Sequence, residues 1–237
     1  MSRPPPPQLS INKLSRRFTM NVSDAVESRK SIRNFLKRPV ENDLIAELLE
    51  KSARAPSGGN LQPWKIYVLN NETLDRFVNH VAEQKAPESP EYAVYPPNLK
   101  APYRDWRYKL GEDMYALLQI PREDKPARLA HLARNFKFFD APAAFFCFVD
   151  RIMGPPQWSD LGMFLQNFML LAQEAGLDTC PQEAWAQWPN TVAEFVGAPE
   201  ELMLFCGMAI GYANPDAPVN DLVSDREPLK VWATFVE

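Results

Sequence analysis

The chain is poor in histidine and cysteine, and it contains no long apolar run. Only two histidines occur in 237 residues, and they lie far apart, at His80 and His131. We therefore expect no metal site. No segment approaches the ~20 consecutive apolar residues of a membrane helix. The N-terminal residues lack the apolar core of a secretory signal, so we predict a protein of the cytoplasm that does not enter membranes.

The cysteine pattern and the charge balance support this view. Cys147, Cys180 and Cys206 lie in separate apolar segments and form no CxxC pair. This pattern predicts reduced, buried thiols, as is typical of cytoplasmic proteins. The formal net charge of -4 gives no basis for binding nucleic acid.

Several signature motifs of large enzyme classes are missing. The chain has no GxxxxGK phosphate loop and no GxGxxG dinucleotide fingerprint after a strand. It also lacks the HExxH motif of zinc proteases and the GxSxG motif of serine hydrolases. These absences argue against nucleotide triphosphatases, Rossmann dehydrogenases and both hydrolase classes.

Hydrophobic spacing predicts a domain of alternating helices and strands after an N-terminal tail at 1–21. Apolar residues at helical spacing predict helices, and short apolar runs predict strands, of which 143–149 is buried on both faces. The predicted helices lie at 41–53, 72–84, 104–118 and 158–175. The predicted strands lie at 65–69, 143–149, 177–180 and 202–210.

Two polar clusters stand out as candidate binding segments. The sequence SRKSIR at 28–33 carries three cations and two hydroxyls, and APSGGNLQPW at 55–64 joins a helix to a strand. The second cluster combines hydrogen-bonding side chains with glycines that let a ligand approach the backbone closely. Together they predict an anion site and a ring site for one cofactor. The alternative is a solvated charge run and an ordinary connecting loop.

Four motifs in order give the chain a family resemblance. They are SRKSIRNF at 28–35, the loop at 55–64, PQEAW at 181–185, and GY at 211–212 followed by DREPL at 225–229. This arrangement resembles the FMN-dependent nitroreductase family over about 22–235, so the resemblance assigns 22–237 to a nitroreductase domain. The segments 95–107 and 134–142 look like the branch that acts on nitrobenzoate or nitroaromatic herbicides.

The resemblance implies an α+β fold with a mixed, mainly antiparallel sheet flanked by helices. It further implies an interlocked homodimer with two FMN sites at the interface. The implied activity is NAD(P)H-dependent reduction of nitroaromatic compounds, in a ping-pong cycle through flavin N5 with NADPH or NADH as donor. No side chain is expected to act as a catalytic acid or base, because the cofactor carries the chemistry. The alternatives are another flavin reductase on this scaffold, acting on quinones, enones or halogenated compounds, and a non-catalytic flavin-binding protein.

The same resemblance assigns the cofactor-binding residues. Phosphate and ribityl contacts are implied for the basic segment near residue 30 and for Arg226, whereas the loop after residue 55 comes from the partner subunit. The position two before Arg226 is Ser224, where many relatives carry a basic residue. The implied cofactor-binding residues are Arg29, Lys30, Ser31, Arg33, Pro56, Ser57, Asn60, Gln62, Arg134, Lys137, Pro181, Gln182, Glu183 and Arg226.

The segment 85–110 is the candidate specificity element. It interleaves prolines with aromatic residues, and long irregular segments in compact domains are usually functional or disordered. We expect it to cover the exposed flavin face and to rank substrates, without being needed to bind FMN. The alternative is that its aromatic residues pack only into the dimer core. The candidate substrate-binding residues are Tyr95, Tyr103, Trp106, Arg107 and Trp185, the last of which also fits a core position.

Overall fold

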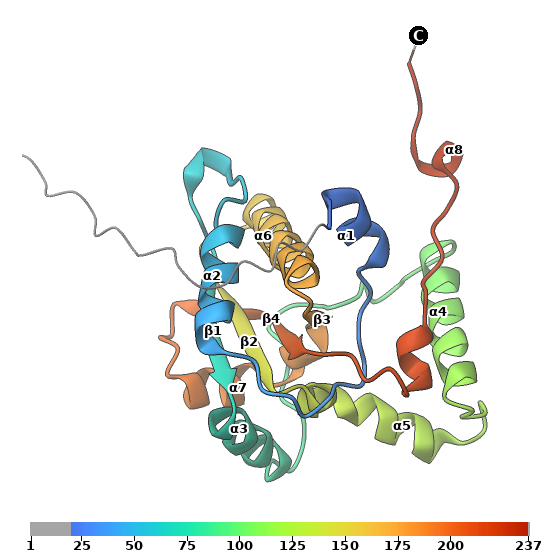
Figure 1. The fold of residues 1–237 in the computed structure, drawn as a ribbon, viewed down its shortest axis with the longest axis horizontal. Coiled ribbons are helices and arrows are strands. Elements are labelled where there is room, and N and C mark those ends of the chain that lie inside the picture. Colours follow the sequence, from blue (N-terminus) through green and yellow to red (C-terminus); the bar gives the residue numbers. More distant parts are fainter. Residues whose placement is uncertain (1–19, 237) are drawn as a thin grey trace, which may run out of the picture.

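A four-stranded antiparallel sheet forms the centre of the protein. The computed structural model describes residues 20–236 of the chain. Within them the sheet has the order β1-β2-β4-β3 (Figure 1). The strands are β1 (Lys65–Asn70), β2 (Ala143–Asp150), β3 (Asp178–Gln182) and β4 (Leu202–Gly211). The α+β class and the four strands predicted from the apolar runs are confirmed.

The central strand β2 fixes the register of its neighbours. It pairs antiparallel with β1, with Tyr67 opposite Phe146, and with β4, with Cys147 opposite Cys206. Strand β3 joins the far side of β4, also antiparallel. The sheet was expected to be mixed and mainly antiparallel, and the four strands described here are all antiparallel. A single parallel bridge, between Ser31 and Thr179, lies outside them.

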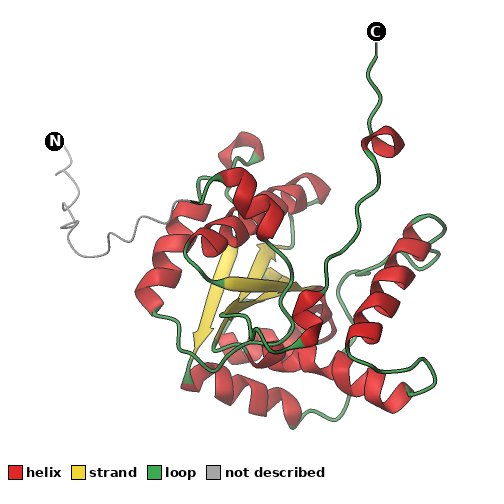
Figure 2. Ribbon diagram, turned by 45° about the vertical axis from the view of Figure 1, so that its right-hand side comes forward, coloured by secondary structure: helices red, strands yellow, loops and turns green. Residues whose placement is uncertain are grey.

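Helices cover both faces of the sheet, because side chains along β2 alternate between two apolar cores (Figures 1 and 2). Phe145 packs in one core with α2 (Asn42–Ser52) and α6 (Pro155–Glu174). Phe146 packs in the other core with α3 (Glu72–Ala82) and α7 (Pro189–Val196). Every β2 residue except the last is buried, which explains its unbroken apolar sequence.

The remaining helices lie outside this sandwich. They are α1 (Val22–Ser28), α4 (Tyr103–Leu117), α5 (Lys125–Ala133) and α8 (Leu229–Trp232). The helices predicted at 41–53, 72–84, 104–118 and 158–175 are confirmed as α2, α3, α4 and α6. Helix α4 differs from them in having no buried residue, so its apolar stripe is left partly open.

The C-terminal segment, residues 218–236, begins beside the body of the protomer and then extends away from it (Figures 1 and 2). Its apolar side chains are exposed: Trp232 is 69% exposed and Phe235 is 81% exposed. The predicted N-terminal tail lies almost wholly outside the described residues. None of the helices in the described part is both long and apolar enough to cross a membrane.

Candidate functional site

The basic segment after α1 is held against the edge of the sheet. Ile32 N–H donates to the carbonyl oxygen of Thr179 on β3 at 3.0 Å, and the Ile32 side chain is buried. The residues on either side of Ile32 are only partly buried. The backbone is therefore anchored while Ser31 and Arg33 remain accessible.

Asn220 provides the second anchor. It lies in the 3-10 turn η4 (Pro218–Asp221) and is 6% exposed. Its side-chain oxygen accepts from Arg33 N–H at 2.9 Å, and its Nδ2 donates to the Asn34 carbonyl oxygen at 2.8 Å. The sequence analysis did not single out this residue, since a lone asparagine carries no sign of partners nearly 190 positions away. Asn220 fixes the basic segment to the start of the C-terminal segment.

These two segments enclose a cavity of about 750 Å³. Helix α4 contributes Leu110 to its wall, and α6 contributes Gln166. Five of the residues implied for FMN meet here although one of them lies almost 200 positions from the others. These five lining residues are Arg29, Lys30, Ser31, Arg33 and Arg226.

The cavity is a predominantly cationic site. Four of its lining residues are cations and one, Glu27, is a carboxylate, but within residues 20–236 none of the four cations makes an ion pair with a carboxylate. Burial, reinforced by the charge of Arg226, lowers the pKa of Arg29. Clustered cations that outnumber their counter-charges are costly unless an anion joins them. The donor set fits the phosphate group of FMN, because guanidinium groups offer several charge-assisted hydrogen bonds to phosphate oxygens.

Arg226 is oriented by its own turn. Its Nη1 donates to Ser224 Oγ at 2.7 Å and to the carbonyl oxygen of Asp225 at 2.8 Å. Its side chain is exposed in the protomer. Ser224 thus contributes by holding Arg226.

The loop at 55–64 does not border this cavity. Gly59 has a φ of 59°, a left-handed conformation that suits glycine, and Gly58 N–H donates to Asp160 Oδ2 on α6 at 3.2 Å. Ser57 Oγ accepts from Gln62 N–H at 3.1 Å. The side chains of this loop that are implied to meet the flavin lie at its surface. They do not line the cavity that the five residues above share. These loop residues are Pro56, Ser57, Asn60 and Gln62.

The PQE segment at the end of β3 has a mixed arrangement. Pro181 and Glu183 are exposed, whereas Gln182 is 2% exposed. The Gln182 side chain points inward, and its Nε2 donates to the Asn135 carbonyl oxygen at 2.8 Å. Gln182 therefore positions the turn η2 (Arg134–Asp140), and its side chain is not presented to a ligand.

The two basic residues of η2 are also outside the cavity. Arg134 forms an ion pair with Asp140 at 2.8 Å, which occupies part of its guanidinium. Lys137 is exposed. Neither lines the cavity formed by the basic segment and Arg226.

Trp185 is a core residue, and its expected place in the substrate pocket is wrong. Its side chain is 0% exposed, and its ring lies 4.7 Å from Phe138 and 5.3 Å from Phe77, centroid to centroid. Gly207 on β4 makes room for it, because a Cβ there would lie 2.4 Å from Trp185 Cδ1. The ring fills the core beneath the sheet, on the side of α3.

The other four substrate candidates lie at the surface. Arg107 stacks over the Tyr95 ring at 4.1 Å, and the rings of Tyr103 and Trp106 meet edge to face at 5.3 Å. Tyr95 is 49% exposed and Tyr103 is 61% exposed. Earlier in the same segment, the Tyr92 hydroxyl donates to the Phe205 carbonyl oxygen and ties the segment to β4. The arrangement presents an aromatic and cationic surface anchored at its base.

Comparison with known proteins gives a consistent result. The sequence model of the Nitroreductase family matches residues 26–212. The 4-nitrobenzoate reductase of Pseudomonas putida is 34% identical over 220 residues, which cover 92% of this chain and 97% of that protein. The nitrobenzene nitroreductase of Ectopseudomonas oleovorans is also 34% identical, over 91% of this chain and 96% of that protein.

The fold is shared with a solved structure. The FMN- and NADPH-dependent nitroreductase NfnB from Sphigopyxis sp. strain HMH superimposes with a TM-score of 0.88 and is 41% identical. The match covers 92% of this chain and 100% of that chain.

Proposed function

Because the chain belongs to the nitroreductase family, we propose that it is an FMN-dependent oxidoreductase that uses NAD(P)H to reduce nitroaromatic compounds. The observation that carries this proposal is the cavity lined by four cations without carboxylate partners. Such a site requires an anion, and the phosphate of FMN meets that requirement.

The residues of the cavity divide the binding of FMN among them. Arg29, Lys30 and Arg226 hold the phosphate, and the Ser31 hydroxyl is available to the ribityl chain. Arg33 adds charge, although its Nη1 is partly used by the Ser31 carbonyl oxygen at 3.2 Å. When bound, FMN supplies two-electron transfer from NAD(P)H to the acceptor. The protein binds and orients both partners of the reaction, and none of its side chains is assigned a proton-transfer role.

An interlocked homodimer completes the site. The loop bearing Pro56, Ser57 and Asn60 does not reach the cavity of its own protomer, so we assign it to the cavity of the partner. Gln62 belongs to the same loop. Arg134, Lys137, Pro181 and Glu183 remain candidates for contacts with the ring portion of FMN.

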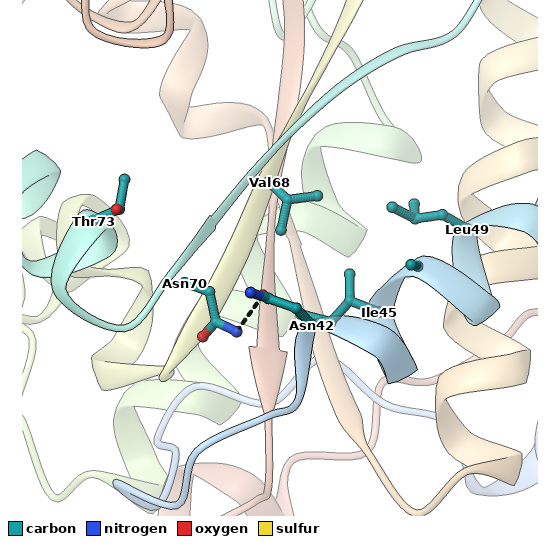
Figure 3. A pocket seen from close by; sticks show the side chains of 7 residues that line it. Asn42, Ile45, Leu49, Val68, Asn70 and Thr73 are labelled. Carbon is teal, nitrogen blue, oxygen red and sulfur yellow. Dashed lines mark hydrogen bonds between the residues drawn. The ribbon is translucent and has the colours of Figure 1, made fainter.

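The exposed apolar end of the C-terminal segment, which carries Trp232 and Phe235, supports the same assembly because it is free to pack against a second subunit. A groove of about 340 Å³, lined by both apolar and polar side chains, lies between α2 and the edge strand β1, with Ile45, Leu49 and Val68 facing one another (Figure 3). Asn70 and Asn42 close one end by a hydrogen bond of 2.8 Å. An edge strand beside a groove is suited to receive an extended segment from a second subunit.

The segment 85–110 supports the choice of substrate class. Tyr95 and Tyr103 offer exposed ring surfaces on which a flat, electron-poor ring can stack. Arg107, already placed over Tyr95, can meet a nitro or carboxylate group.

The three cysteines support a cytoplasmic location. All three are buried and free, as expected for a protein kept in a reducing environment.

The decisive test compares electron acceptors under anaerobic conditions. The FMN-loaded protein should oxidise NADPH rapidly when 4-nitrobenzoate or nitrobenzene is present, and slowly without an acceptor. Parallel reactions with a quinone, an enone and a halogenated phenol address the alternative reductases. Faster turnover of any of these acceptors than of every nitroaromatic compound would assign the protein to that other activity. No oxidation with any acceptor would favour a non-catalytic flavin-binding role.

A further inference from the structure

Helix α4 is attached to the C-terminal segment on both sides of Arg226. Trp106 Nε1 donates to Glu227 Oε1 at 2.7 Å. One turn further along the helix, Lys109 Nζ pairs with Asp225 Oδ2 at 2.8 Å. Figure 1 shows α4 beside this segment, where the C-terminal segment leaves the body. The only residue between the two attached carboxylates is Arg226.

The same helix also forms part of the cationic cavity. Leu110, which follows Lys109, lines it together with Arg226. The segment 85–110 was expected to cover substrate without contributing to cofactor binding. However, this segment contacts the residues on either side of Arg226, and it contributes to the cavity wall. Both observations indicate a role in cofactor binding as well.

The two carboxylates next to Arg226 pose an electrostatic problem. A free Asp225 or Glu227 side chain can reach nearby guanidinium groups and compete with a phosphate for them. Lys109 engages Asp225, and it also pairs with Asp113 at 2.6 Å. Hydrogen bonds to Asp113 and Asp225 raise the pKa of Lys109, so the lysine stays charged over the physiological range.

We propose that Lys109 and Trp106 are positioning residues for FMN. They hold the carboxylates of Asp225 and Glu227 away from the phosphate site, and they fix the turn from which Arg226 reaches it. This inference rests on the proposed function. It assigns α4 two roles, since one part of it anchors the phosphate clamp while Tyr103 and Arg107 remain on the surface offered to substrate.

The test compares the affinities of the apoprotein for FMN and for riboflavin, which lacks the phosphate. Lys109→Ala should weaken FMN binding up to about fivefold, as expected for losing one exposed charge pair, and leave riboflavin binding unchanged. Lys109→Arg should restore most of the FMN affinity. Trp106→Phe keeps an aromatic ring but loses the N–H donor to Glu227, so it should also weaken FMN binding.

Arg104→Ala is the matched control. Arg104 is an exposed cation on the same helix, and its ion pair is with the neighbouring Asp105, so its loss should leave both affinities unchanged. In an Arg226→Ala background, Lys109→Ala should weaken FMN binding less than it does in the wild-type background, because one of the residues it positions is gone.

Each alternative outcome counts against a defined part of this account. Equal losses of FMN and riboflavin affinity in Lys109→Ala would show that α4 acts only as a structural support. An unchanged FMN affinity, or a full effect in the Arg226→Ala background, would also overturn the positioning role. A wild-type protein that binds FMN no better than riboflavin would overturn the phosphate site itself, and with it the proposed function.

Discussion

Replacing Arg29 by methionine should change cofactor affinity and apoprotein stability in different directions. Arg29 is partly buried, lines the cationic cavity and makes no ion pair with a carboxylate among the described residues. Its pKa is lowered by burial and by the charge of Arg226. Methionine keeps the aliphatic bulk of the side chain and removes the charge, so Arg29→Met isolates the electrostatic contribution.

The magnitude follows from the type of contact. A hydrogen bond to a charged group contributes about 1.5–3 kcal/mol, which corresponds to a loss of about 10- to 150-fold in FMN affinity. The stability of the apoprotein should stay constant or rise, because the variant no longer holds a desolvated cation against a second one. A residue kept for function at a cost in stability is expected at a ligand site.

Two measurements on the same preparations test this reasoning. Titration of apoprotein with FMN gives the dissociation constant, and denaturant unfolding of apoprotein gives the stability. An unchanged dissociation constant would remove Arg29 from the phosphate site. A fall in apoprotein stability of more than about 1 kcal/mol, beyond the usual effect of a surface substitution, would show that Arg29 serves the fold instead.

Four further outcomes are expected. The purified protein should be yellow, and phosphodiesterase treatment of its released cofactor should yield no AMP, because FAD contains an AMP group and FMN does not. Its mass in solution should be that of a dimer, and a monomer that retains FMN would contradict the shared site. Trp185→Ala should cost about 3–5 kcal/mol of unfolding free energy, seen in denaturant melts, as for a large core side chain. Burial, with the charges of Arg134 and Arg33, lowers the pKa of His131 to about 4, below its usual value of 6.5. The unfolded chain therefore binds more protons between these values, so stability falls as pH drops from about 6.5 to 4, and His131→Leu should lose less stability across that range.

The elements that could be predicted are those with repeated apolar signals. The continuous run AAFFCFV of β2 indicated a strand buried on both faces, and the stripe through Leu161, Phe164 and Phe168 indicated the central helix α6. The cation cluster at 28–33 was also visible, because three cations fall within six residues. Local pattern was sufficient in these cases.

What could not be predicted concerns residues whose role depends on distant partners. Trp185 follows PQEA in the sequence, and only Gly207 on the neighbouring strand makes a place for its ring in the core. Gln182 turns inward because Asn135, from another turn, accepts its hydrogen bond. The pairing of Lys109 with Asp225 was invisible for the same reason, since an exposed lysine on a helix has many possible partners.

The central claim is that this protein passes electrons from NAD(P)H to a nitroaromatic acceptor through one bound FMN. Anaerobic rapid mixing of the FMN-loaded protein with one equivalent of NADPH, followed by 4-nitrobenzoate in a second mixing step, tests it directly. The visible absorbance of the oxidised flavin should disappear in the first step and return in the second. Absorbance that never falls with NADPH or NADH, or that falls and does not return with any nitroaromatic acceptor, would contradict it.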